Sequence, residues 1–414
     1  MLTDTSVQAV RGSAPWRPGP RTEALLGLLL VPVATLVGFV AALWRLLTKR
    51  NAALADAPSL SIGPATERLA DVAAFAAAAE AEPVEWRGGF GLMDFEFVFA
   101  RDIVPATLDA WPKLANRFFK CPAPFRRVSF NSLDGTPICA EVATRDDRDR
   151  PGLIVVHGTF GASDHSIYSR PAIVAFEEWG FNVAVVNLRG WGCTAALSDA
   201  PLSGGWREAE DVLAAARYLL EHTRTTTVGA IGYSLGGATV LLAAAHELAP
   251  TLLQSGVFSE SGFTDARNVL HIVEGRPLPW SLRFIGHWLF RFGFRTKFRA
   301  LKVRARSIID YFENVAAPYY GVTDQELYAH DSAIHKVAEI RVPALQLHAV
   351  DDWIVSVEHA ERLRAEAART GNRLVCVCIR ERGAHCAFAR VAREWRDGLA
   401  RRFFAGTSGI TLAA

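Results

Sequence analysis

The sequence predicts an α/β fold, a mostly parallel sheet with helices on both faces. Apolar runs alternate with helical stretches, which is typical of parallel strands that are buried on both sides. These runs are 153–156, 183–186, 227–231, 253–259 and 344–347. The second observation is a Gly-x-Ser-x-Gly pentapeptide at 232–236, with a strand-like run before it and an alanine- and leucine-rich run after it. The chain of 414 residues, half of them hydrophobic, is long enough to bury one large core with appended elements.

The amino-terminal segment predicts a membrane anchor. Residues 1–23 have the composition of a disordered tail, whereas residues 24–44 are 21 residues without a charge. As a helix rising about 1.5 Å per residue, 24–44 would span the roughly 30 Å hydrocarbon core of a bilayer. A secretory signal has a shorter apolar part, of about 7 to 15 residues. A buried core helix is the other alternative, and the basic residues on both flanks argue against it.

The charges beside this segment predict its orientation. Arg17 and Arg21 precede it, and Arg45, Lys49 and Arg50 follow it. The small excess on the second flank favours a single-pass anchor with a cytoplasmic catalytic domain.

The rest of the chain divides by composition. Residues 45–124 are expected to be a linker and helical extension, with an alanine-rich helix over 66–82. The catalytic domain is expected over 125–404, with a carboxyl-terminal tail at 405–414. The domain should start with a hairpin of strands 127–130 and 136–142, since Asp134-Gly135 between them is a turn signal.

The interval between the strands ending at 259 and starting at 344 is too long for an ordinary connection, and predicts an inserted helical cap over about 260–335. Within it, 275–309 combines nine Arg or Lys residues with seven aromatic ones and contains no Asp or Glu. We expect cap helices with solvated cations; contact with anionic lipid headgroups is the alternative. Nucleic-acid binding is not expected, because no recognition motif accompanies the basic residues.

Ser234 is the candidate nucleophile. A serine at the tip of a tight strand-to-helix turn is exposed to substrate, and Gly232 and Gly236 let the backbone bend and pack closely. A serine hydroxyl is a weak nucleophile near neutral pH. It needs a base within hydrogen-bonding reach, which an acid must orient.

The acid and the base are expected in the order Ser, acid, His. The strand 344–347 runs into Asp351-Asp352, and we select Asp352, with Asp351 as the alternative. A further strand at 373–379 is followed by Gly383-Ala384-His385, which makes His385 the candidate base.

The loop 157–161, His-Gly-Thr-Phe-Gly, follows the strand 153–156 and is expected to supply half of an oxyanion hole. The predicted donors are the backbone N–H groups of Thr159 and of Leu235, the residue after the nucleophile. His157 itself is expected to be structural.

The six cysteines show neither zinc-finger spacing nor a Cys-x-x-Cys pair, so we expect reduced thiols without a chemical role. The cysteines are Cys121, Cys139, Cys193, Cys376, Cys378 and Cys386.

Together these motifs resemble the α/β-hydrolases, and more narrowly the YheT-type esterases and the membrane-anchored α/β-hydrolase-domain lipases related to them. The matching features are the loop 157–161 with Ser163-Asp164 soon after, the stretch 186–192, the elbow at Ser234, and 308–321 leading through Tyr328 to the acidic turn. They extend from about 125 to 404. Trp191 and Trp353 depart from the pattern, standing where those proteins have a small residue and a proline.

The resemblance and the residues imply a serine hydrolase of carboxylic esters that acts through an acyl-enzyme on Ser234, Asp352 and His385. The resemblance and the anchor favour a lipid or other apolar ester, such as an acylglycerol or phospholipid. An acyltransferase using the same groups and a non-catalytic membrane-bound scaffold are the alternatives. No metal or organic cofactor is expected.

Overall fold

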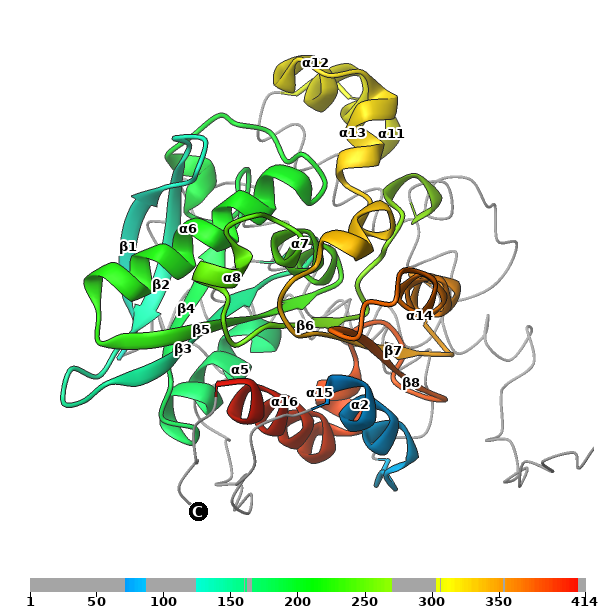
Figure 1. The fold of residues 1–414 in the computed structure, drawn as a ribbon. Coiled ribbons are helices and arrows are strands. Elements are labelled where there is room, and N and C mark those ends of the chain that lie inside the picture. Colours follow the sequence, from blue (N-terminus) through cyan, green and yellow to red (C-terminus); the bar gives the residue numbers. More distant parts are fainter. Residues whose placement is uncertain are drawn as a thin grey trace, which may run out of the picture.

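The computed structural model describes residues 71–86, 124–159, 161, 166–269, 303–305, 307–352 and 354–408. They form an eight-stranded sheet in the order β1-β2-β4-β3-β5-β6-β7-β8 (Figure 1). The strands are β1 (Arg126–Asn131), β2 (Pro137–Ala143), β3 (Arg150–Val156), β4 (Asn182–Asn187), β5 (Thr225–Tyr233), β6 (Val257–Glu260), β7 (Ala344–Ala349) and β8 (Val375–Arg380). Every pair from β4 to β8 is parallel, while β2 pairs antiparallel with both β1 and β4. The predicted α/β fold with a mostly parallel sheet is confirmed.

Helices cover both faces of this sheet (Figure 1). One face carries α6 (Trp206–His222), α7 (Leu235–Ala244), α8 (Ala249–Leu252) and α14 (Glu358–Thr370). The other carries α2 (Val72–Ala81), α5 (Ser166–Glu177), α15 (Phe388–Val391) and α16 (Arg393–Ser408).

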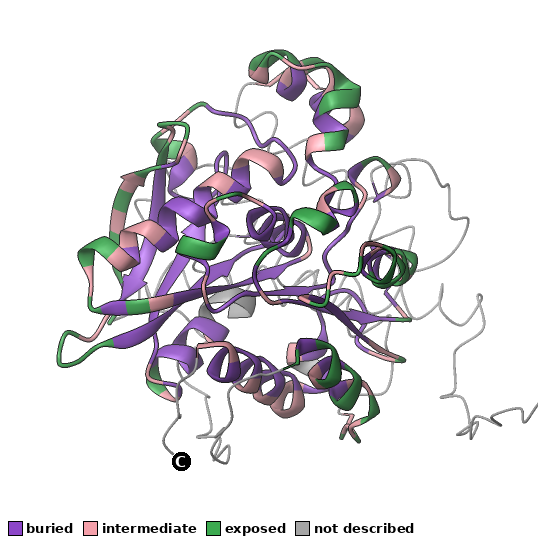
Figure 2. Ribbon diagram, in the orientation of Figure 1, coloured by how far each residue is buried: buried purple, intermediate pink, exposed green. Residues whose placement is uncertain are grey.

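The central strands are apolar throughout because each face of the sheet has its own core. On β3, Ile154 and Val156 belong to one core, whereas Leu153 and Val155 belong to the other. Successive strand side chains point to opposite faces, so a strand covered on both sides needs an unbroken apolar run. The sheet is accordingly buried along its centre (Figure 2).

The strand predicted over 253–259 is shorter than expected. β6 begins only at Val257, because α8 ends at Leu252 and Gly256 turns the chain with a φ of 74°. A positive φ of this size favours glycine. β5, in contrast, continues to Tyr233, directly before the candidate nucleophile.

Part of the predicted cap over 260–335 falls within the described residues. It contains α11 (Ile308–Tyr311), the π-helix η3 (Phe312–Ala316), α12 (Ala317–Tyr320) and α13 (Asp324–His330), followed by the 3₁₀-helix η4 (Ala333–Glu339). α11 to α13 stand away from the sheet (Figure 1). The Tyr311 hydroxyl donates a 3.2 Å hydrogen bond to the Leu202 carbonyl, which fastens this segment to the loop before α6. Most of the basic and aromatic stretch 275–309 lies outside the described residues.

Within the described residues, the helix predicted over 66–82 is observed as α2, where the side chain of Asp71 accepts the N–H groups of Ala73 and Ala74. α2 packs against β8, where the Arg380 guanidinium donates to the carbonyl groups of Ala79 and Glu82 at 3.2 and 2.9 Å. At the other end of the domain, α16 continues four residues past 404, to Ser408.

The predicted anchor at 24–44 and the tail at 1–23 lie outside the described residues. Within the described ranges, no helix has both the length and the apolar composition needed to cross a bilayer.

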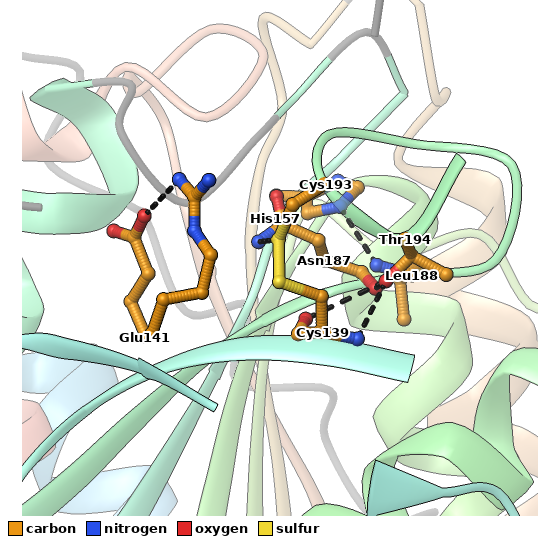
Figure 3. The surroundings of a disulfide bond; sticks show 8 residues. Cys139, Glu141, His157, Asn187, Leu188, Cys193 and Thr194 are labelled. Carbon is orange, nitrogen blue, oxygen red and sulfur yellow. Dashed lines mark hydrogen bonds and ion pairs between the residues drawn. A yellow bond between two sulfur atoms is a disulfide. The ribbon is translucent and has the colours of Figure 1, made fainter. Parts of the chain in front are cut away.

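A disulfide joins Cys139 on β2 to Cys193 in the loop after β4 (Figure 3). The expectation of reduced thiols is therefore wrong for these two residues. β2 lies beside β4 with Cys139 opposite Asn187, and the chain turns back after β4, so the two Cα atoms come within 5.8 Å. The Thr194 hydroxyl also accepts the N–H of Cys139 at 2.9 Å. Cys376, Cys378 and Cys386 are free and buried, and Cys121 lies outside the described residues.

Replacing Cys193 by serine is expected to lower the free energy of unfolding by about 2–4 kcal/mol, because the crosslink restricts the unfolded chain over a sequence separation of 54 residues. Chemical denaturation with and without a reductant measures this. Reductant should destabilise the wild type and a Cys376→Ser control alike, and leave the Cys193→Ser variant unchanged. Equal sensitivity in all three proteins would contradict the prediction.

Candidate active site

Ser234 lies at a strained turn between β5 and α7. Its backbone has φ 53° and ψ −115°, a conformation that costs an L-residue about 1–3 kcal/mol. A Cβ on Gly232 would lie 2.0 Å from the carbonyl oxygen of Gly236, and a Cβ on Gly236 would lie 2.5 Å from the carbonyl oxygens of Val156 and His157. The two glycines of the pentapeptide are therefore required by close backbone packing, as the sequence predicted.

The three side chains predicted to act together are hydrogen-bonded in a line. The Ser234 hydroxyl oxygen lies 2.8 Å from Nε2 of His385. Nδ1 of the same imidazole lies 2.9 Å from Oδ2 and 3.1 Å from Oδ1 of Asp352. With Nδ1 protonated and donating to the carboxylate, Nε2 is free to accept the serine proton. His385 follows β8 and Asp352 follows β7, so neighbouring parallel strands deliver both groups to the same edge of the sheet as Ser234.

Asp352 is held as a buried carboxylate. Burial alone would raise its pKa, but the charge of His385 and the hydrogen bond from that ring, with smaller contributions from His348 and the Val355 N–H, lower the pKa below its ordinary value. Oδ1 accepts the N–H groups of Ile354 and Val355, each at 3.0 Å. The carboxylate is thus ionised at neutral pH and fixed in orientation.

The neighbouring carboxylate, Asp351, has a different partner. Its Oδ1 accepts the N–H of Ala384 at 2.7 Å, the residue before His385. Asp351 therefore contacts the backbone of the histidine loop, and the contacts to the imidazole ring are made by Asp352.

The pKa of His385 is raised well above its ordinary value. Burial acts in the opposite direction, but the charge of Asp352 outweighs it, and Cys386 and the hydrogen bond to Asp352 add to the effect. The site therefore stabilises the imidazolium that forms when His385 takes a proton.

The two predicted oxyanion donors lie on segments that pack against each other. Leu235 is the first residue of α7, so its N–H has no partner four residues earlier in the helix. The close approach of Gly236 to the carbonyls of Val156 and His157 brings the end of β3 against the first turn of α7. Thr159 follows two residues later, in a turn in which the Gly161 N–H donates to the Gly158 carbonyl at 2.9 Å.

His157 is fully buried and holds two loops together. Its Nε2 accepts the N–H of Leu188 at 3.1 Å, which requires that Nε2 carry no proton. Nδ1 then donates to the Gly158 carbonyl at 2.8 Å. The side chain of Trp191 packs edge-on to the His157 ring at a centroid distance of 6.3 Å, within the loop that the disulfide fastens.

The family described as alpha/beta hydrolase fold matches residues 151–388, more than half of the chain. The chain belongs to this family.

Several relatives of this α/β-hydrolase can be named. A monoacylglycerol lipase from Saccharomyces cerevisiae is 24% identical over 247 residues, or 56% of this chain, and the chain spans about half (53%) of that relative's length. Among solved structures, an esterase from Pyrococcus furiosus is 16% identical with a TM-score of 0.49, covering 67% of this chain and 91% of its own. A puromycin-hydrolyzing peptidase from Mycobacterium tuberculosis is 19% identical with a TM-score of 0.47, covering 70% of this chain and 40% of its own.

One buried histidine beside the acid was not predicted from the sequence of this α/β-hydrolase. His348, near the end of β7, donates from Nε2 to the Val355 carbonyl at 2.9 Å. Burial lowers the pKa of His348, against the charge of Asp352, whose Oδ2 lies 3.7 Å from Nε2. His348 therefore braces the turn that carries Asp352 as a neutral side chain. The only sequence signal was its place four residues before the acid.

Proposed function

We propose that this α/β-hydrolase is a serine hydrolase that cleaves carboxylic esters, with Ser234 as nucleophile, His385 as general base and acid, and Asp352 as the orienting carboxylate. The observation that carries the proposal is the hydrogen-bonded line from Ser234 through His385 to Asp352. It begins at a strained strand-to-helix turn and ends at a buried, ionised carboxylate. Nucleophilic catalysis by serine requires these groups in this order of contact.

In the proposed reaction, the Ser234 hydroxyl oxygen attacks the ester carbonyl while Nε2 of His385 takes the hydroxyl proton. The backbone N–H groups of Leu235 and Thr159 stabilise the oxyanion, each by about 3 kcal/mol. The carbon–oxygen bond to the leaving alcohol then breaks, and the alkoxide takes the proton from His385. Water, deprotonated by His385, attacks the acyl-enzyme and releases the acid and the free serine. Every group used belongs to the chain, and no cofactor is proposed.

The proposed substrate is a lipid or other apolar ester. Support comes from the relative named a monoacylglycerol lipase, from the resemblance to YheT-type esterases and membrane-anchored lipases, and from the uncharged segment 24–44, which we propose as a membrane anchor. The basic and aromatic stretch 275–309 would add contact with the lipid surface. Disulfides are typical of oxidising compartments, so the Cys139–Cys193 bond argues against the cytoplasmic side that the flanking charges favour.

The test uses a fluorophosphonate probe and p-nitrophenyl esters of increasing acyl length with the purified protein. A serine hydrolase should take up one probe molecule and release p-nitrophenol, and the preferred chain length should report the acyl specificity. Product analysis with an added alcohol separates hydrolysis from acyl transfer, because an acyltransferase forms the new ester in preference to the acid. If the protein is not labelled and releases no p-nitrophenol, the non-catalytic scaffold becomes the better explanation.

The pH dependence of kcat/KM should show an acid limb with a midpoint above about 6.5, the ordinary pKa of histidine. Activity requires unprotonated Nε2, and Asp352 raises the pKa of His385, so protonation inactivates the enzyme at a higher pH than it would for an isolated imidazole. Measuring kcat/KM from pH 5 to 9 checks this. A midpoint well below 6.5 would contradict the expected electrostatic effect of Asp352.

A further inference from the structure

The corner at the carboxyl end of β6 touches the segments that carry all three proposed catalytic side chains. The carbonyl of Glu260 accepts the N–H of Ser234 at 2.9 Å. The hydroxyl of Ser261 accepts the N–H of Cys386, the residue after His385, at 3.1 Å. The N–H of Ser261 donates to the Leu347 carbonyl on β7, the strand that leads to Asp352, at 2.9 Å. Two consecutive residues thus connect the nucleophile, the base and the strand of the acid.

Backbone strain is concentrated at this corner. Within the part of the chain that the structure describes, the non-glycine residues with positive φ are Ser234, Ser261, Ala384 and Cys386, with values from 43° to 54°. Ser234 is the candidate nucleophile, and Ala384 and Cys386 flank His385. Ser261 lies between the nucleophile and the histidine loop. Such conformations persist only where surrounding contacts enforce them, and they gather at functional sites. The corner therefore needs a source of rigidity.

A buried ionic cluster beneath the corner supplies this rigidity. We name it the Arg396 cluster; it comprises Tyr233, Glu260, Arg396 and Asp397. The side chain of Arg396 extends from α16. Its Nε donates to Glu260 Oε2 and its Nη1 donates to Asp397 Oδ1, each at 2.7 Å. Nη2 donates to the Tyr233 hydroxyl, and the guanidinium carbon lies 5.1 Å from the centroid of that ring. All four side chains are buried.

The contacts of this guanidinium have a direct geometric consequence. Tyr233 is the residue before Ser234, and Glu260 is the residue whose carbonyl accepts the Ser234 N–H. One planar, multidentate group therefore holds both backbone segments that set the position of the nucleophile. A lysine could not hold both partners in this way, because its single ammonium lacks the planar fork of donors.

Stability alone does not explain a buried cluster of this kind. Desolvating an arginine and two carboxylates is costly, and well-packed apolar residues of similar volume are often as stabilising or more so. The ionic cluster adds orientation, because its charge-assisted hydrogen bonds weaken steeply when their distances and angles depart from the preferred range.

We propose that Arg396 is a positioning residue for catalysis: it acts through Tyr233 and Glu260 to hold Ser234 and the histidine loop in reactive alignment. This inference rests on the proposed serine hydrolase function. Arg396 touches neither the substrate nor the reacting atoms in this scheme, so its effect should fall on the chemical step and not on substrate binding.

The experiment compares Tyr233→Phe and Arg396→Lys with Leu399→Ala, using the ester assay and the fluorophosphonate labelling rate. Leu399 is fully buried on the same helix and has an aliphatic side chain, so its truncation weakens the packing of α16 without removing a hydrogen bond to Tyr233 or Glu260. Tyr233→Phe deletes one hydroxyl and keeps the ring. It therefore tests the inference in a folded protein even if Arg396→Lys does not fold. In both variants kcat and the labelling rate should fall by about tenfold to a hundredfold, with KM within about twofold of the wild type. Leu399→Ala should keep the kcat of the wild type at a temperature at which every protein is folded.

The possible results separate this inference from the proposed function. If Tyr233→Phe and a folded Arg396→Lys kept the kcat and labelling rate of the wild type, or lost no more than Leu399→Ala, the positioning role would be wrong while the hydrolase function stood. If KM rose with kcat unchanged, the cluster would act on binding and the inference would also be wrong. Absence of activity and of labelling in the wild type would instead reject the proposed function itself.

Discussion

Ser234→Ala is expected to abolish ester hydrolysis without disturbing the fold, with kcat falling by roughly 10⁴-fold or more. The substitution removes the only atom proposed to bond to the acyl group, and the oxyanion donors and substrate contacts that stay can supply only a small residual rate. The hydrogen bond recorded for the Ser234 hydroxyl joins it to Nε2 of His385. The turn itself is held by backbone contacts, such as the N–H of Ser234 to the Glu260 carbonyl, which alanine keeps.

This expectation is measured by kcat on the best p-nitrophenyl ester, by the mass of the intact protein after treatment with fluorophosphonate, and by the midpoint of thermal unfolding. Ser255→Ala is the matched control, because Ser255 is a buried serine that lies before the amino end of β6, away from the nucleophile. The control should be labelled and active. Labelling of Ser234→Ala, or activity close to that of the wild type, would show that another residue is the nucleophile.

The sequence could predict the elbow because all of its determinants are local. An apolar strand, two glycines around a serine and an alanine-rich helix lie within about twenty residues of each other, and their order alone specifies the turn at Ser234. The candidate acid and base could be located in the same way, since each follows a strand-like run. In a parallel sheet the ends of neighbouring strands meet at one edge, so strand order brings Asp352 and His385 to Ser234.

Features that depend on distant pairs could not be predicted. Cys139 and Cys193 have no motif spacing, and they meet only because β2 lies antiparallel to β4 and the following loop turns back. Arg396 is 163 positions from Tyr233 and looks like an ordinary charged residue of an amphipathic helix. Its burial follows from the packing of α16 under β5 and β6, which no local pattern encodes. The strained φ values at Ser261 and Cys386 likewise arise from tertiary contacts.

Asp352→Asn is expected to lower kcat by about 10³- to 10⁴-fold, whereas Asp351→Asn should stay within a few-fold of the wild type. An asparagine at 352 can still accept the N–H groups of Ile354 and Val355 through its oxygen. Its amide nitrogen would then face Nδ1 of His385 and favour the tautomer with the proton on Nε2, which cannot accept the proton of Ser234. The loss is thus one of tautomer and charge, with little change in shape.

The two substitutions differ because the two carboxylates contact different parts of the histidine loop. Asp351 accepts the Ala384 N–H, a bond that the asparagine oxygen can also accept, so Asp351→Asn preserves the loop and leaves the imidazole with its own carboxylate. The acid limb of the kcat/KM profile gives a second readout. Loss of the Asp352 charge should move that limb to lower pH, because this charge raises the pKa of His385. If Asp351→Asn instead produced the larger loss in kcat and the shift in the limb, Asp351 would be the orienting acid, and the hydrogen bonds to Asp352 would serve only to hold the turn after β7.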